Sequence, residues 1–391
     1  MISRYKVAIK ARALLRAVSV AGQTKFRPAG ALLVAGSLAL FCDAAAAQSI
    51  TDVVAPREPL ILKQQGSFFV GGRQTQSDAS GWDQTPPVSA FGSGDVTVDQ
   101  MYVQFQIPLT SSPRKKVPLV FVHGCCLSSK TWETTPDGRM GWYEYFTRLG
   151  HPTYLAEQSG RARSGFNGTT YNEVKRGIRA PNEQPFVLLA TYQFAWSIFR
   201  FGPSYGVAWP DEQFPMNKVD ELFKQVIPDL ILTEVPDLAA EFVTPTTNNP
   251  TVANMAALSR DLGGVILVGH SQSSGFPTQA ALKDPSVIRG IIQLETGCFG
   301  NLTADEVAIL AKIPLLVVVG DHFSTPQPPA TCTTELQQIK AAGGDMTFVA
   351  LPTLGLIGNS HMFMQDRNNL EVADIIEDWI RRHVERKQRG R

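Results

Sequence analysis

A serine in the second half of the chain has the surroundings of a nucleophile. Residues 265–269 have the apolar composition of a buried strand, and Ser271 follows them after one histidine. Residues 277–282 are then apolar enough to form a helix. A tight turn between a strand and a helix raises a serine hydroxyl above the sheet and directs the helix N-terminus towards it. Ser271 is therefore predicted to be a nucleophile, with Ser273 standing where the usual G-x-S-x-G pattern has its second glycine.

A serine hydroxyl is a poor nucleophile at neutral pH and needs a histidine to accept its proton. In folds with this turn, the histidine lies on a loop after the last strand. His361 has that position, because it follows the apolar run 346–351 and precedes the final helical segment. The remaining histidines belong to segments with other predicted roles, and they are His123, His151, His270, His322 and His383. His361 is therefore the predicted base.

Two acidic residues compete to orient this histidine. Asp321 ends the apolar run that starts at Leu315, which is where most proteins with this arrangement place the carboxylate. Glu295 ends the preceding run, and the extra methylene of a glutamate lets it reach the imidazole from one strand further away. Both satisfy the chain order serine, acid, histidine. The general pattern alone favours Asp321.

A histidine–glycine pair predicts the site that stabilises a negatively charged oxygen. His123 and Gly124 follow the buried strand run 117–122, so the backbone amides of Cys125 and Gln272 are predicted to donate to the oxyanion. Cys126 comes directly after Cys125. Adjacent cysteines can close a strained eight-membered ring that fixes the local backbone. The alternative is two free thiols, or pairing of each with a cysteine elsewhere.

Short apolar runs alternate with helical patterns along most of the chain. Continuous apolar runs without polar alternation are typical of strands that are covered on both faces. They are residues 117–122, 153–155, 265–268, 288–294, 314–319 and 346–351, preceded by a β-rich segment at 96–107. The last helical pattern places apolar residues of 372–383 on one face. The sequence therefore predicts an α/β fold with a doubly wound, mostly parallel sheet.

Two stretches do not fit this alternation. Residues 48–94 are rich in Gly, Gln, Ser and Asp, which predicts an N-terminal extension of edge strands and turns. Residues 171–261 are much longer than one crossover requires and rich in aromatic residues. They are predicted to form a cap insertion whose aromatic side chains line an apolar acyl or aryl pocket. The alternative is a helical subdomain in which these aromatic side chains pack on one another.

The first 47 residues predict an export signal. A long basic segment without acids leads into an apolar block at 31–41, too short to span a bilayer, and then into the alanine run 44–47. Cleavage after Ala47 would leave a mature chain from Gln48 to the C-terminus, in the periplasm or secreted, with no stable membrane anchor. A tethering helix and a lipid anchor on Cys42 are the less favoured readings.

The charge of the chain narrows the range of partners. Lys and Arg total 36 against 35 Asp and Glu, so no strong field attracts nucleic acid or an anionic membrane. A small neutral or apolar substrate fits better, and the aromatic cap offers a surface for a homodimer. The histidines and cysteines show no metal-ligand spacing, and no phosphate-binding glycine loop occurs, so no cofactor is predicted. After loss of the leader four cysteines remain, for which three connectivities are open: Cys125, Cys126, Cys298 and Cys332.

At two places the sequence resembles a small group of exported bacterial esterases of the α/β-hydrolase superfamily, typified by an Alcaligenes esterase with a vicinal disulfide at the oxyanion site. The resemblance covers most of the chain from about Met101 onward. The segments that carry it are Gly124-Cys-Cys-Leu with residues 131–142 and 158–161, and Gly358-Asn-Ser-His-Met with residues 365–368.

This resemblance implies a serine, glutamate and histidine triad. Carried onto this sequence, the triad is Ser271, Glu295 and His361, and Asp321 takes a supporting role. The resemblance also implies the disulfides Cys125–Cys126 and Cys298–Cys332. The expected function is a serine carboxylesterase that forms an acyl-enzyme with small carboxylic esters. The alternatives are lactonase, amidase, acyltransferase or perhydrolase chemistry, or a periplasmic binding module without catalysis.

Overall fold

The computed structural model describes residues 48–54, 56–77, 93–110, 116–231, 249–295, 298, 300–325 and 327–386. The predicted leader, residues 1–47, lies outside the described residues. No helix in these ranges is long and apolar enough to cross a membrane.

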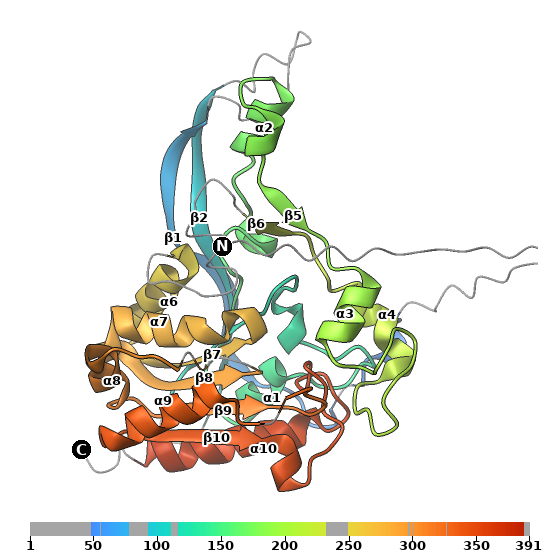
Figure 1. The fold of residues 1–391 in the computed structure, drawn as a ribbon, viewed down its shortest axis with the longest axis vertical. Helices are drawn as coiled ribbons and strands as arrows, with labels where there is room; N and C mark the ends of the chain where they lie inside the picture. Colours follow the sequence, from blue (N-terminus) through green and yellow to red (C-terminus); the bar gives the residue numbers. More distant parts are fainter. Residues whose placement is uncertain are drawn as a thin grey trace, which may run out of the picture. The chain divides into compact units, whose positions relative to one another are not determined.

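An eight-stranded sheet lies at the centre of the fold (Figure 1), in the order β1-β2-β4-β3-β7-β8-β9-β10. The strands from β4 to β10 pair in parallel, whereas β2 pairs antiparallel with β1 and with β4. The strands are β1 Leu62–Ser77, β2 Gly94–Pro108, β3 Leu119–Val122, β4 Thr153–Ala156, β7 Val265–His270, β8 Ile288–Leu294, β9 Leu315–Val319 and β10 Met346–Ala350. Every residue of β3, β4, β7 and β9 is buried, as their unbroken apolar runs predict.

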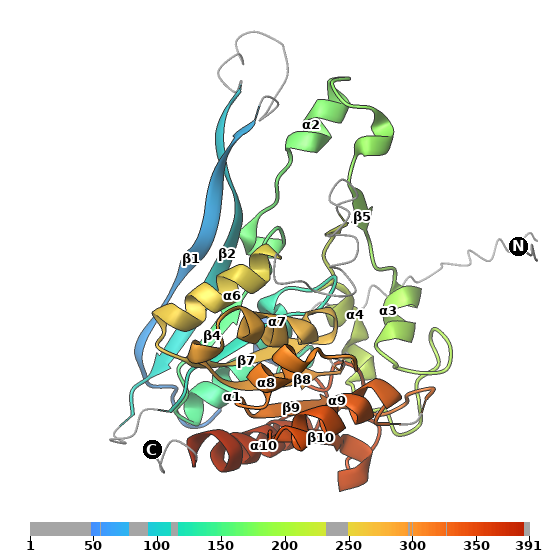
Figure 2. The ribbon, with the colours of Figure 1, turned by 60° about the vertical axis from the view of Figure 1, so that its left-hand side comes forward.

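Helices cover both faces of this sheet, which confirms the predicted doubly wound α/β fold. Apolar residues of α1 and α10 pack with Phe121 and Val268 on one face. Apolar residues of α6, α7, α8 and α9 pack with Val120 and Leu267 on the other. Figure 2 shows these two layers. The helices are α1 Trp142–Arg148, α6 Pro250–Asp261, α7 Phe276–Lys283, α8 Ala304–Leu310, α9 Ala330–Ala341 and α10 Asn369–Trp379.

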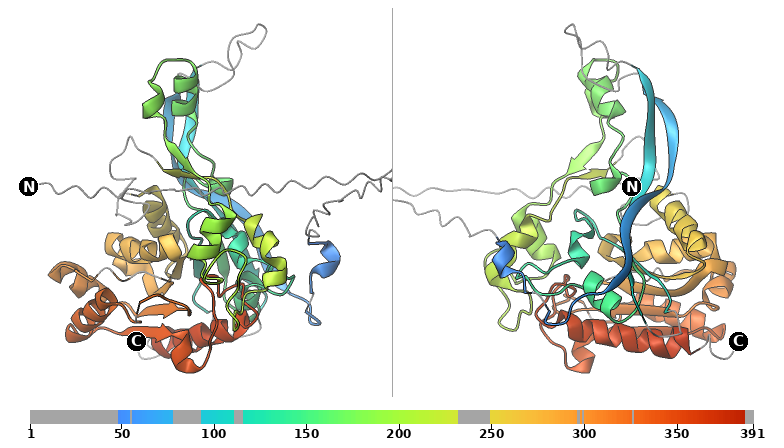
Figure 3. Two further views of the ribbon diagram at one scale, coloured as in Figure 1. Left: turned by 45° about the vertical axis from the view of Figure 1, so that its right-hand side comes forward. Right: turned by 180° about the vertical axis from the view of Figure 1, so that it is seen from behind.

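The long segment between β4 and α6 forms a small unit of its own secondary structure. Its elements are α2 Thr169–Lys175, β5 Phe186–Leu188, α3 Tyr192–Ile198, α4 Val219–Phe223 and β6 Asp229–Ile231, and β5 pairs antiparallel with β6. Figure 3 shows α2 and β5 (green) projecting from the rest of the fold in the same direction as the far end of the β1–β2 ribbon (blue). Helix α6 falls within the predicted insertion, but its apolar face packs on the main sheet. We call residues 169–231 the insertion.

Several aromatic side chains of the insertion are buried and pack on one another, whereas Tyr192, Phe194 and Tyr205 are exposed. Phe201 and Phe214 are fully buried with ring centroids 4.5 Å apart. Trp196 meets Phe201 edge to face, and both belong to the core that includes α1 and α10. For these residues the structure agrees with the alternative reading, in which the aromatic side chains pack on one another.

Candidate active site

Ser271 occupies the tight turn that the sequence predicts. Strand β7 ends at His270, and the 3-10 turn Ser271–Gly275 leads directly into α7. Ser271 has a φ of 56°, in the left-handed region that non-glycine residues rarely adopt. Backbone strain of this kind concentrates at functional sites, where the surrounding structure maintains it. A Cβ added at Gly269 would lie 2.3 Å from the Ser273 carbonyl oxygen, so the turn requires glycine there.

Ser273, which replaces the second glycine of the usual pattern, is a structural part of this turn. Its buried hydroxyl oxygen lies 3.1 Å from the backbone N–H of His270, which donates to it. The hydroxyl group lies within donating distance of the carbonyl oxygen of Val122, at 3.1 Å. It thereby joins the nucleophile turn to the end of β3, a bond that glycine could not make.

His361 and Glu295 form a hydrogen-bonded pair. His361 Nδ1 lies 2.9 Å from Glu295 Oε2. Its backbone N–H donates to Phe199 O at 3.0 Å, and the Phe199 ring is stacked on the imidazole. Burial lowers the pKa of His361, against the opposing effect of Glu295. The other ring nitrogen, Nε2, is buried without a hydrogen-bond partner among the described residues.

The Glu295 carboxylate is held from three directions. Glu295 directly follows β8, and its backbone has a φ of 74°. Oε1 accepts a hydrogen bond from Gly320 N–H at 2.7 Å. Oε2 accepts a hydrogen bond from His361 Nδ1 and forms an ion pair with Arg200, whose Nη2 lies 2.6 Å away. Burial alone would raise the pKa of Glu295, but the Arg200 charge and the His361 hydrogen bond lower it to about 2. Glu295 is thus a fully buried carboxylate that stays ionised.

Asp321, the other candidate acid, has different partners. Its carboxylate accepts hydrogen bonds from the backbone N–H of His322 at 2.7 Å and of Gly358 at 3.0 Å. The second of these bonds fixes the start of the loop that carries His361. The structure therefore brings Glu295 to the imidazole and places Asp321 in support of the loop.

His270 adds a second contact to the same loop. Its Nε2 lies 2.9 Å from the carbonyl oxygen of His361 and must donate to it, and the two ring centroids are 4.8 Å apart. Burial and the neighbouring His361 lower the pKa of His270 to about 3, so the ring is neutral. Because Ser271 is the next residue, this bond ties the nucleophile turn to the histidine loop.

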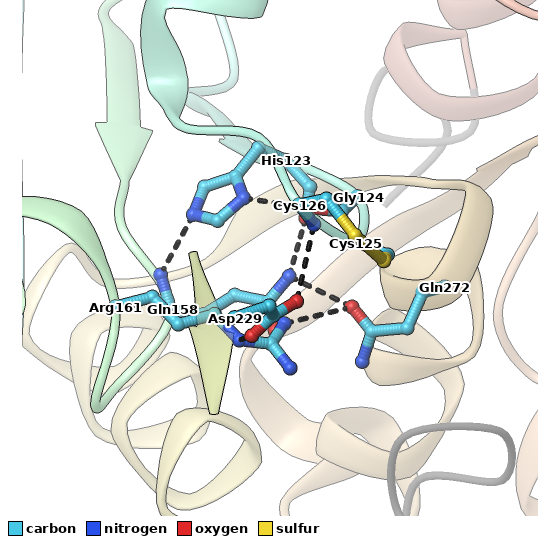
Figure 4. The surroundings of a disulfide bond; sticks show 8 residues. All are labelled: His123, Gly124, Cys125, Cys126, Gln158, Arg161, Asp229 and Gln272. Carbon is cyan, nitrogen blue, oxygen red and sulfur yellow. Dashed lines mark hydrogen bonds and ion pairs between the residues drawn. A yellow bond between two sulfur atoms is a disulfide. The ribbon is translucent and has the colours of Figure 1, made fainter. Parts of the chain in front are cut away.

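The predicted oxyanion loop lies directly against the serine. A Cβ added at Gly124 would be 2.9 Å from Ser271 Cβ and 3.0 Å from His270 O. Cys125 and Cys126 are joined by a disulfide, and Cys126 has a φ of 62°. The N–H of Cys126 donates to Asp229 Oδ2 at 3.1 Å (Figure 4). The backbone N–H of Cys126 therefore already has a hydrogen-bond acceptor.

Comparison with known proteins places the chain among esterases. No family model matches the chain. A solved bacterial esterase is 45% identical, covers 85% of this chain and 99% of its own, and superimposes with a TM-score of 0.74. The chain belongs to the α/β-hydrolase esterases. A probable secreted lipase from a fungal species (strain ATCC 74256) is 27% identical over an alignment of 344 residues, which covers 72% of this chain and 86% of that relative. The predicted resemblance and enzyme class, a hydrolase of carboxylic esters, are confirmed.

In this esterase Asp229 of the insertion links the predicted oxyanion loop to Arg161, which follows β4. Asp229 of β6 pairs with Arg161, whose guanidinium also donates to the Gln272 side chain at 3.0 Å. Gln158 donates to the same Gln272 oxygen at 3.0 Å. Figure 4 shows these side chains gathered beside the disulfide. Sequence reasoning did not assign a role to Arg161 or Asp229, although 158–161 was one of the segments that carried the resemblance.

An apolar cavity of about 710 Å³ lies next to this cluster. Phe166, Tyr171, Val187 and Ile227 provide much of its wall, and Arg161 lines it as well. The N–H of Ile227 donates to the carbonyl oxygen of Cys126 at 2.9 Å. The wall of the cavity is therefore hydrogen-bonded to the backbone of Cys126.

Two side-chain clusters have the composition of metal ligands. In the first, Cys125 and Cys126 are consumed by their disulfide and Asp229 is paired with Arg161. The second consists of Asp211, Asp321 and His322, whose ligand atoms lie within 4.8 Å of one another. The Asp321 oxygens already accept backbone hydrogen bonds, and His322 Nε2 lies 3.2 Å from Asp211 Oδ1. These contacts explain both clusters without an ion. A further disulfide joins Cys298 to Cys332.

Proposed function

We propose that this esterase acts through an acyl-enzyme on Ser271, with His361 as base and Glu295 as the acid of the triad. The observation that carries the proposal is the 2.9 Å contact between His361 Nδ1 and Glu295 Oε2 beside a serine in a left-handed turn. His361 Nε2 takes the Ser271 proton as the alkoxide attacks the ester carbonyl. Ionised Glu295 orients the imidazole and stabilises its cation.

The oxyanion of the tetrahedral intermediate is held by the backbone amides of Cys125 and Gln272 in this proposal. The bond from Cys126 N–H to Asp229 supports it, since that amide is engaged while the disulfide holds its neighbour beside the serine. The alcohol leaves with the proton from His361. A water molecule, deprotonated by the same base, then hydrolyses the acyl-enzyme.

The substrate proposed is a small ester whose apolar part occupies the cavity beside the disulfide. The apolar side chains of its wall and its connection to Cys126 through Ile227 support this placement. Lactone and amide hydrolysis, acyl transfer and perhydrolysis would use the same residues. Assays on lactone and amide substrates distinguish the first two from ester hydrolysis, and product analysis with alcohol and peroxide as acceptors distinguishes the last two.

Kinetics of two proteins test this function. The chain from Gln48 and its Ser271→Ala variant are assayed on aryl esters of increasing acyl length, and both are treated with a fluorophosphonate. Activity and labelling that are both lost with Ser271 support the acyl-enzyme. Labelling without ester hydrolysis would retain the nucleophile and reject the substrate, whereas unchanged hydrolysis in Ser271→Ala would reject the mechanism.

We further propose export, with removal of residues 1–47 and release into the periplasm or medium. The description of the fungal relative as a secreted lipase supports this, as do the two disulfides, because disulfides persist in oxidising compartments. Mass spectrometry of the exported protein is expected to give an N-terminus at Gln48. Exposed apolar side chains on α3, among them Phe194 and Ile198, support a homodimer, which light scattering tests.

A further inference from the structure

Arg200 is a largely covered cation in contact with the proposed triad. It follows α3 in the insertion, with a φ of 59°. Only 13% of its side chain is exposed. The pattern of the sequence assigns it no role, because it lies far along the chain from both triad partners, 161 residues before His361.

The guanidinium is fixed by contacts on all sides. Nη2 lies 2.6 Å from Glu295 Oε2. Nη1 lies 3.1 Å from His361 Nδ1, but the Nδ1 proton is donated to Glu295, so this close approach brings two donors together and is not a hydrogen bond. Nε donates to the Asp321 carbonyl oxygen at 2.7 Å. The Cζ atom lies 4.0 Å from the centroid of the Phe323 ring, over which the guanidinium is placed. The group is therefore held in one orientation by the chain segments that follow β8 and β9.

Two electrostatic consequences follow from this placement. A cation against the carboxylate keeps Glu295 ionised although it is buried. Burial is the largest cause that lowers the pKa of His361, and the Arg200 cation adds to it because it opposes a second positive charge on the adjacent imidazole. In a triad without such a cation, the carboxylate alone would favour the protonated histidine.

We propose that Arg200 is a positioning residue of this esterase, which holds the ionised Glu295 carboxylate under His361 and keeps the base unprotonated at mildly acid pH. The proposal rests on the proposed triad. It gives the insertion a direct part in catalysis, because Arg200 and its neighbour Phe199 bring both a charge and a backbone acceptor to the base.

Other ionisable groups also face the histidine or its loop. The loop itself is held by Asp366, whose carboxylate accepts hydrogen bonds from Asn359 and Ser360. The ionisable groups on the packed elements are Glu295 after β8, His270 at the end of β7, Asp321 after β9, Asp366 before α10, and Glu212 and Arg200 in the insertion. Because several groups contribute, the test compares variants that alter only the Arg200 charge.

The measurement is the pH dependence of kcat/KM, whose acid limb reports protonation of the base in the free enzyme. Arg200→Gln and Arg200→Met remove the charge, and Arg200→Lys keeps it without the planar fork. Removing one like charge within 4–6 Å typically changes a pKa by about 1 to 3 units. We expect the acid limb of both neutral variants to move to higher pH by at least about one unit, so that activity well below the limb falls about tenfold. The acid limb of Arg200→Lys should stay near that of the native enzyme, with a lower plateau.

Arg73→Gln is the matched control, because it removes the same charge from an exposed site on β1, where Arg73 pairs with Asp99. The rate of fluorophosphonate labelling is followed over the same pH range, so that loss of the triad itself is distinguished from a shift of its titration. A neutral variant that folds and labels with an unmoved acid limb would overturn the proposal. So would failure of both neutral variants to fold while Arg200→Lys folds with a shifted limb, since Arg200 would then be structural only.

Discussion

Substituting Gly124 by alanine should disable the oxyanion loop with little effect on substrate binding. The new Cβ would lie 2.9 Å from Ser271 Cβ, 3.0 Å from His270 O and 3.1 Å from His270 Nδ1. None of these atoms is the end of a flexible side chain. Since carbon atoms pack at about 3.5–4.0 Å, the loop must withdraw from the serine by roughly half an ångström or more. The amide of Cys125 moves with it.

The loss of one oxyanion donor typically lowers kcat by about 10² to 10³, or 2.7–4 kcal/mol of transition-state stabilisation. We expect Gly124→Ala to lose kcat by about a hundredfold with KM changed only a few-fold, and to lose on the order of 1–3 kcal/mol of stability from overpacking. Steady-state kinetics on an aryl ester and urea denaturation measure both. Gly94→Ala is the control, because a Cβ at Gly94 meets nothing within 4 Å. Native-like kcat in folded Gly124→Ala would refute the placement of the oxyanion site.

Three further predictions concern the triad, the disulfide and the histidine loop. Glu295→Gln should lower kcat by about 10⁴, as loss of a triad carboxylate does. Asp321→Asn, which affects only the loop, should lower kcat far less, and steady-state kinetics of both variants on an aryl ester measure the difference. Reduction of Cys125–Cys126, verified by mass, should lower kcat by about tenfold or more because the loop backbone is released, and full activity after cleavage contradicts this. Burial raises the pKa of Asp366 from its ordinary 3.8 to about 6, so the folded state binds its proton more tightly than the unfolded chain. The contribution of Asp366 to stability should therefore fall as pH rises from about 4 to about 6, and Asp366→Asn should remove this slope in chemical denaturation.

The nucleophile turn could be predicted because its determinants are local. A buried strand, Gly269 and a small residue at 273 specify the turn within a few positions. His361 could also be predicted from the sequence, since its place after the last strand follows from chain order. The alternating apolar runs also predicted the order of buried strands and their helical cover.

The choice between Glu295 and Asp321 could not be made from the residues. Both end adjacent parallel strands, so both carboxylates reach the same edge of the sheet. What separates them is the left-handed backbone at Glu295 and the Gly358 amide that holds Asp321. Neither feature has a signature in the sequence, and only the resemblance to known esterases favoured Glu295.

Contacts between segments that are distant in the chain also could not be predicted from the sequence pattern. Arg200 and Asp229 look like ordinary charged residues of a polar stretch, yet each is buried against a partner far away in the chain. Some aromatic residues of the insertion are buried, whereas Tyr192 and Phe194 are exposed, and the sequence pattern does not separate the two groups. Phe201 and Phe214 fill a core, because each packs on the other and on the sheet.

The insertion contacts both parts of the proposed catalytic apparatus, through Phe199 and Arg200 at the proposed base and through Asp229 at the predicted oxyanion loop. This places a limit on how the enzyme can change. A segment that covers the substrate is usually the part that evolution or an engineer exchanges to alter specificity. Here an exchanged segment that lacks these three residues would remove turnover together with the old specificity. Changes in substrate range are therefore expected to arise from single substitutions in the cavity wall, while the rest of the insertion is retained.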